Sequence, residues 1–175
     1  MKKIHLGWEG PFGLEAVKAL DNWDYDFGLY QVYGPHPIYC SIQLLYIGRV
    51  VNQPFALRIP KHWWTEHTRD PSQNSIYVGR LLGASTPDNE TWSREIVLAE
   101  SLLIYAHYPT YNKQKDPGKT KESDLKDLQV LNWGSHRDLL PEVSYARLEA
   151  MPGDYKRYGS HQPARTTPAA LAGSP

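Results

Sequence analysis

Cysteine is almost absent from this chain, and Cys40 is its only instance. A single thiol excludes an intrachain disulfide and a four-cysteine zinc site. The N-terminal residues lack the apolar core of a signal peptide, and no stretch approaches the ~18 uninterrupted apolar residues that a membrane span requires. We therefore expect a protein of the reducing cytoplasm with no membrane partner.

An excess of positive charge is also missing, since 19 basic residues balance 19 acidic ones. This neutrality disfavours a protein that holds nucleic acid by charge alone, although a local basic face remains compatible with it. Aromatic residues are plentiful, with 6 Trp and 12 Tyr. They suit either core packing or stacking against nucleobases, and composition does not choose between the two.

The pattern of β-formers, turn residues and apolar spacing predicts an alternation of strands and helices. Strands are predicted over residues 2–7, 27–33, 41–51, 75–83, 128–133 and 143–148. Helices are predicted over 14–21, over 54–67, and from the capping sequence at 86–89 to just before Pro109. Residues 113–127 are predicted to form a lysine-rich loop.

This order predicts an α/β (α+β) fold with a small central mixed or antiparallel sheet flanked by helices. The strands at 27–33 and 41–51 carry bulky residues on both faces, so we expect this hairpin to be central in the sheet. The predicted organisation is an N-terminal extension over 1–26 packed on the core, one domain over 27–150, and a disordered tail over 151–175, which is rich in Gly, Pro, Ser and Ala.

Glu100 is the only charge in a helical stretch, residues 96–106, that is otherwise almost entirely apolar. Burying a carboxylate is expensive unless a cation or hydrogen-bond donors compensate it. A salt bridge to Arg94 or Arg58, or a bound metal ion, would compensate the charge of Glu100. The apolar stripe beside Glu100 is predicted to consist of Trp92, Ile96, Ala99, Leu103 and Ala106.

Two tripeptides, Gly28-Leu29-Tyr30 and Tyr46-Ile47-Gly48, stand in the two arms of the predicted hairpin. Arg58, His62, Glu100 and Asn112 follow in that order. This set resembles the GIY-YIG nucleases over about residues 27–112. Weaker similarities at 8–12, 128–134 and 140–144 point toward the restriction-endonuclease members. The resemblance implies the GIY-YIG nuclease fold and hydrolysis of phosphodiester bonds.

The resemblance also implies a role for each matched residue. Tyr30 would be the general base that deprotonates water, and Arg58 would hold the scissile phosphate. Glu100 would bind one hard divalent ion, Mg²⁺ or Mn²⁺, per active site. His62 would orient Tyr30 or share in proton transfer, Tyr46 would position the phosphate or water, and Asn112 would brace the site.

Pro60 lies between Arg58 and His62 and interrupts the predicted helix. The two side chains therefore need not share a helix face, and His67 is a second candidate for the imidazole. DNA contacts are expected in the lysine-rich loop and around 63–64, which is Trp-Trp. The loop lysines proposed for this role are Lys113, Lys115, Lys119 and Lys121.

Other classes fit less well. Asp88, followed by Asp124 and Lys126, satisfies a loose PD-(D/E)xK nuclease pattern, but that pattern needs its last two residues on a core strand. A zinc hydrolase lacks a third ligand near the two histidines. A binding module of the same fold without catalysis and a partner-binding protein with an aromatic interface remain as alternatives.

The resemblance thus implies a metal-dependent endonuclease that acts on DNA, with the restriction type favoured and RNA left open as a substrate. One metal ion per site would cut one strand, because carboxylates are scarce among the matched residues. Cutting a duplex would then require a homodimer or two successive nicks.

Overall fold

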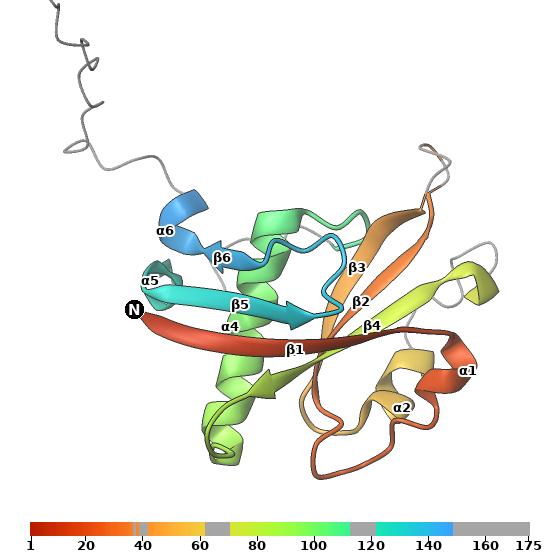
Figure 1. The fold of residues 1–175 in the computed structure, drawn as a ribbon, viewed down its shortest axis with the longest axis horizontal. Coiled ribbons are helices and arrows are strands. Elements are labelled where there is room, and N and C mark those ends of the chain that lie inside the picture. The colour runs from red at the N-terminus through yellow and green to blue at the C-terminus, as the bar shows by residue number, and fades with distance from the viewer. Residues whose placement is uncertain (37, 39–41, 62–70, 113–121, 149–175) are drawn as a thin grey trace, which may run out of the picture.

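The computed structural model describes residues 1–36, 38, 42–61, 71–112 and 122–148 (Figure 1). They form a mixed α/β fold around one curled six-stranded sheet, in the order β3-β2-β4-β1-β5-β6. The pairing of β1 with β5 is parallel and the other pairings are antiparallel. The strands are β1 Lys2–Phe12, β2 Gly28–Pro35, β3 Ile42–Val50, β4 Ser75–Leu82, β5 Leu128–Gly134 and β6 Glu142–Ser144. The predicted mixed sheet with flanking helices is confirmed at this level.

Helices cover the two faces of the sheet separately (Figure 1). The helices are α1 Leu14–Val17, α2 Phe55–Arg58, α4 Asn89–His107, α5 Glu122–Lys126 and α6 Tyr145–Leu148, with short 3-10 turns at Ile59–Lys61 and Pro71–Gln73. Helix α4 closes one core with residues such as Leu6, Leu29 and Leu103. Helices α1 and α2 close a second core, which contains Val17, Tyr30 and Phe55. No helix among the described residues is long and apolar enough to cross a membrane.

Strand β2 is interior, as predicted, but the prediction for β3 is wrong, because β3 forms an edge of the sheet. Its apolar residues are nevertheless protected by the segment that follows α4. The Tyr111 amide donates to the Leu45 carbonyl at 2.8 Å, and the Asn112 side chain bonds to both backbone groups of Ile47. A sheet edge can be covered by a loop in this way, and the sequence pattern of β3 does not distinguish such cover from a neighbouring strand.

Strand β1 lies between β4 and β5, so residues of the predicted N-terminal extension share one sheet with the rest of the chain. It is longer than predicted and continues to Phe12 through an irregularity after Glu9. Strands from before and after the stretch 27–112, β1 and β5, thus lie inside the sheet, so that stretch alone does not contain a complete core.

Three predicted elements differ in extent or type. Within the described part of the helix predicted over 54–67, α2 ends at Arg58 and a 3-10 turn follows at Ile59–Lys61, where Pro60 supplies no backbone donor. Residues 62–67 of that prediction lie outside the described residues. Residues 122–126 of the predicted loop form α5. The strand predicted over 143–148 is limited to Glu142–Ser144, and α6 follows it. Residues 151–175, predicted to be disordered, lie outside the described residues.

Helix α4 begins where its capping sequence predicts. The Asp88 side chain accepts a hydrogen bond from the Thr91 amide at 2.9 Å. Of the predicted stripe, Ile96, Ala99 and Leu103 are buried, whereas Trp92 and Ala106 are half-buried at the two ends. Glu100 itself is buried, with 3% of its surface exposed.

His107, in the last turn of α4, is held as a neutral imidazole. Its Nε2 accepts from the Leu140 amide at 2.9 Å, so the proton is on Nδ1, which donates to the Leu103 carbonyl at 2.9 Å. Burial lowers the pKa of His107 below its ordinary value of 6.5.

A lowered pKa means that the unfolded chain binds this proton more readily than the folded chain does. His107 should therefore destabilise the fold as pH falls below about 6.5 and leave it unaffected at higher pH. We expect His107→Gln to lose less unfolding free energy than wild type between about pH 8 and about pH 5. Urea denaturation at the two pH values tests this, and an identical loss in both proteins would contradict it.

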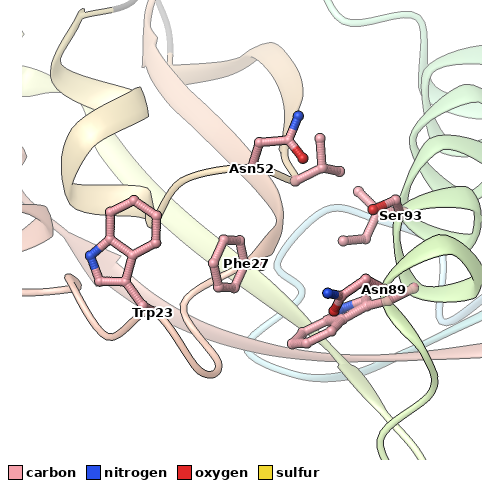
Figure 2. A pocket seen from close by; sticks show the side chains of 8 residues that line it. Trp23, Phe27, Asn52, Asn89 and Ser93 are labelled. Atoms are coloured by element: carbon pink, nitrogen blue, oxygen red, sulfur yellow. The ribbon is translucent and has the colours of Figure 1, made fainter.

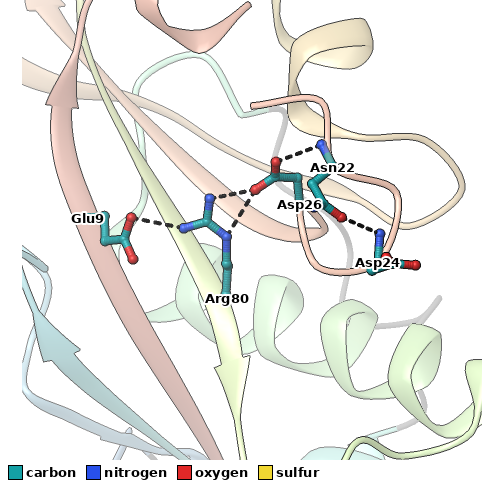
Figure 3. Close-up of polar contacts among 5 residues, drawn as sticks. All are labelled: Glu9, Asn22, Asp24, Asp26 and Arg80. Atoms are coloured by element: carbon teal, nitrogen blue, oxygen red, sulfur yellow. Dashed lines mark hydrogen bonds and ion pairs between the residues drawn. The ribbon is translucent and has the colours of Figure 1, made fainter. Parts of the chain in front are cut away.

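A buried ion pair fixes the loop that leads into β2 (Figure 3). The Asp26 carboxylate accepts from the Arg80 guanidinium at 2.6 and 3.2 Å and from the Asn22 amide at 2.9 Å. Arg80 also contacts Glu9 at 3.0 Å. The Asp26 side chain is 3% exposed, whereas that of Glu9 is 63% exposed. The pair therefore anchors the residues immediately before Gly28.

Removing the Arg80 guanidinium would leave the Asp26 carboxylate buried without its cation. We expect Arg80→Leu to lower the free energy of unfolding by about 3–5 kcal/mol. Glu9→Gln is the matched control, because that contact is exposed and should contribute less than ~1 kcal/mol. Urea unfolding at neutral pH measures both, and equal losses would show that burial of Asp26 is not the cause.

Candidate functional site

The two tyrosine motifs pair directly across β2 and β3. Tyr30 lies opposite Gly48, and Val32 lies opposite Tyr46. The rings of Tyr30 and Tyr46 have centroids 5.9 Å apart at an angle of 40°. Alternation along the strands places both rings on the α2 side of the sheet, beside the edge that β3 forms.

The glycines of the two motifs have a steric cause. A Cβ at Gly48 would lie 2.5 Å from Cζ and 2.6 Å from the hydroxyl oxygen of Tyr30. Gly28 has φ +140°, and a Cβ there would lie 2.1 Å from the Gly79 carbonyl oxygen. Gly48 thus makes room for the phenol of Tyr30, and Gly28 allows β2 to begin closely packed against β4.

Four of the six predicted site residues line one cavity of about 300 Å³. They are Tyr30 from β2, Tyr46 from β3, Arg58 from the end of α2 and Glu100 from α4. The sequence analysis missed other lining residues, notably Arg49, Asn52 and Gln53. The cavity therefore opens where the edge strand, α2 and α4 meet.

Arg49 supplies the cation that the buried Glu100 requires. Its guanidinium forms an ion pair and hydrogen bond with the Glu100 carboxylate, which is buried on α4. Neither of the partners named in the sequence analysis is paired with Glu100 here, and Arg94 instead lies 3.9 Å from Asp124. Side chains alternate along a strand, so Arg49, next to Gly48, faces the α4 side of β3, where Glu100 lies. This alternation is the sequence signal from which Arg49 could have been predicted as the partner of Glu100.

Tyr46 is held in its protonated form. Burial raises the pKa of Tyr46 above its usual value of 10.0, and the negative charge of Glu100 raises it further. The positive charges of Arg58 and Arg49 and a hydrogen bond with the Tyr30 side chain lower the pKa to a smaller extent. Near neutral pH, Tyr46 is consequently a hydrogen-bond donor rather than a base.

Arg58 reaches the cavity because α2 is anchored at its other end. The Phe55 ring is fully buried, and its amide donates to the Asp26 carbonyl at 3.0 Å. Arg58 is exposed, and its guanidinium forms no ion pair with any described residue. A guanidinium in this position can bind a phosphate by donating two parallel hydrogen bonds to it.

Asn112 is not among the residues that line the cavity and instead bonds to the backbone of β3. Its side-chain oxygen accepts from the Ile47 amide and its side-chain nitrogen donates to the Ile47 carbonyl, both at 2.8 Å. These bonds hold the residue that follows Tyr46. The remaining predicted site residues and DNA contacts lie outside the described residues. They are His62, His67, residues 63–64, Lys113, Lys115, Lys119 and Lys121.

The alternative PD-(D/E)xK arrangement does not form. Asp88 caps α4, and its carboxylate also accepts from the Thr91 hydroxyl at 2.7 Å. Asp124 and Lys126 belong to the short helix α5, not to a core strand. Asp88, Asp124 and Lys126 therefore lack the core-strand position that the PD-(D/E)xK nucleases need.

The donors around the cavity fit one hydrated divalent cation. Among the described residues that line it, Glu100 is the single carboxylate, and Tyr46, Asn52 and Gln53 contribute phenol or amide oxygens. Within the described part of the chain, no group of three or more His, Cys, Asp or Glu side chains gathers to hold a metal ion. Mg²⁺ commonly binds through one or two carboxylates and keeps several waters. Such an ion would share Glu100 with Arg49.

Comparisons with protein families, with curated proteins and with solved structures find no match for this chain.

Proposed function

We propose that this chain is a metal-dependent endonuclease of the GIY-YIG type that hydrolyses phosphodiester bonds in DNA. One observation carries the proposal: Tyr30, Tyr46, Arg58 and Glu100, matched to the family by order, line a single cavity although they come from four elements. Scattered tyrosines, an arginine and a glutamate of unrelated purpose have no reason to converge in this way.

The side chains suit the parts of such a reaction. Arg58 would bind the scissile phosphate and stabilise the negative charge that develops on it. Tyr46, held protonated, would donate a hydrogen bond to a phosphate oxygen or to the attacking water. Tyr30 would take a proton from that water as a new phosphorus–oxygen bond forms and the bond to the leaving sugar oxygen breaks. The products are one phosphate end and one hydroxyl end.

Glu100 would hold the cation, which as a Lewis acid supplies charge stabilisation at the phosphate. Arg49 keeps the Glu100 carboxylate oriented and compensated. With one such site per chain, each site would cut one strand, and a restriction-type double-strand cut would need a homodimer or sequential nicking.

A second candidate is a nucleic-acid-binding module of the same fold without catalysis. The Arg49–Glu100 pair favours it, because the buried carboxylate is compensated by protein alone. The two candidates differ in what divalent ions do: hydrolysis requires one, whereas binding by such a module does not.

Supercoiled plasmid tests the proposal without knowledge of a target sequence. The endonuclease should convert unmethylated plasmid to nicked or linear forms with Mg²⁺ or Mn²⁺ and should stop when EDTA is added. The ratio of nicked to linear product reports whether strands are cut singly. Retardation of the plasmid in a gel without cleavage under any divalent ion tried would instead support the binding module.

A further inference from the structure

A second cavity, of about 290 Å³, adjoins the candidate site (Figure 2). It shares Val51 and Asn52 with the first cavity, so the loop that follows β3 forms a wall of both. Trp23 and Phe27 stand on one side of it, and Asn89 and Ser93 of α4 lie across from them (Figure 2). Three segments that are distant in sequence therefore build this cavity.

Three aromatic side chains, Trp23, Phe27 and Trp92, line the cavity. Phe27 and Trp92 meet edge to face, with centroids 5.7 Å apart at 71°. Trp23 is 62% exposed, which is unusual for so large an apolar side chain. Flat rings around a cavity of this size suit a flat ligand that stacks.

One residue that lines the cavity carries a buried donor with no hydrogen-bond partner among the described residues. The indole Nε1 of Trp92 is inaccessible to solvent and forms no hydrogen bond with any described group. Buried donors are nearly always satisfied in folded proteins, so this N–H is available to a ligand once the Trp92 ring turns toward the cavity. The amides of Asn52 and Asn89 add groups that both donate and accept.

The charge of the lining residues restricts the kind of ligand that the cavity can bind. None of the eight described residues that line this cavity carries a charge, so these residues do not match a phosphate. Phosphate contacts belong to the first cavity, where Arg58 and Arg49 lie. Stacking faces combined with neutral donors and acceptors match the edge and face of a nucleobase.

We propose that the cavity formed by Trp23, Phe27, Asn52, Asn89, Trp92 and Ser93 receives a single nucleobase that has left its helical stack. This inference rests on the proposed function, because the base would belong to the strand whose phosphate occupies the adjoining site. A paired base presents neither its two faces nor its pairing edge, so the nucleotide must be extruded or unpaired. The substrate class is therefore DNA with an unpaired or easily unstacked nucleotide at the cut.

Fluorescence binding in EDTA tests this with the full-length wild-type chain and two short duplexes. One duplex carries a single extra, unpaired 2-aminopurine, and the other is fully paired and carries 2-aminopurine within it. The bulged duplex should bind at least about tenfold more tightly, because its base is already unpaired whereas the paired duplex must first extrude one. Its 2-aminopurine emission should fall on binding, as expected for a base that stacks on an indole.

Two variants and one control assign the effect to this cavity. Two variants should reduce the preference for the bulged duplex. Trp23→Ala removes an exposed ring, and Trp92→Phe keeps a ring but removes the N–H donor. Trp133→Ala is the matched control, because Trp133 is 52% exposed but stacks on His5 away from this cavity. It should leave the preference unchanged.

Equal binding of the two duplexes by wild type would overturn the proposal, as would an equal effect of Trp133→Ala and Trp23→Ala. Plasmid cutting by the same preparation separates the two claims. Cutting without a preference for the bulge removes only the base cavity, whereas no binding of either duplex and no cutting removes the proposed function as well.

Discussion

Tyr30→Phe is expected to lower the rate of plasmid cleavage at least ~100-fold, the usual minimum for loss of a positioned general base. The change removes one oxygen and keeps the ring, which is 1% exposed and packs in the core beneath α2. The fold should therefore persist. A single-turnover time course with Mg²⁺ gives the rate, and urea unfolding verifies that the variant is folded.

Tyr33→Phe is the matched control for this variant. Tyr33 is in the same strand, is fully buried and belongs to the core on the α4 side. Its hydroxyl donates to the Gln31 side chain at 2.9 Å, so its loss should cost about 1 kcal/mol of stability with little change in cleavage. A Tyr30→Phe variant that retains most of the wild-type rate would remove Tyr30 from the chemistry.

Arg58→Ala is expected to lower the cleavage rate about 100- to 1,000-fold, the range found when a donor to transition-state charge is removed. Arg58→Lys should restore only part of it, because an ammonium does not make the bidentate contact of a guanidinium. Since Arg58 is exposed, the free energy of unfolding should change by less than ~0.5 kcal/mol in either variant.

Arg94→Ala controls for a general loss of positive charge near DNA. The Arg94 side chain is 66% exposed on α4 and its acidic contact, Asp124, is 3.9 Å away. It does not line the cavity. If Arg94→Ala slowed cleavage as strongly as Arg58→Ala does, charge at a distance rather than contact at the cavity would explain both results.

Local sequence information was sufficient for the elements with strong local determinants. Asp88 starts α4 because its carboxylate satisfies the free amide of Thr91, and this contact depends only on neighbouring residues. Pro60 marks the end of regular helix for a similar reason. The position of β3 at the sheet edge was missed, because its cover comes from Tyr111 and Asn112, whose backbone and side-chain contacts are tertiary.

The candidate site shows the same division. The order of Tyr30, Tyr46, Arg58 and Glu100 was sufficient to expect them together, and they line one cavity. Arg49 was missed because its pairing with Glu100 depends on which face of β3 the helix α4 covers. The aromatic cavity was missed altogether, since residues 23–27, 51–52 and 89–96 show no common pattern until the fold assembles them.

The most direct test of the account compares wild type with Glu100→Gln in one supercoiled-plasmid time course with Mg²⁺. The variant keeps the shape of Glu100 and one acceptor oxygen, and it removes the negative charge that would hold the cation. The account predicts nicked or linear plasmid with wild type and intact plasmid with the folded variant over the same period. Equal cutting by the two proteins would contradict the assignment of Glu100 and of the cavity as the catalytic site.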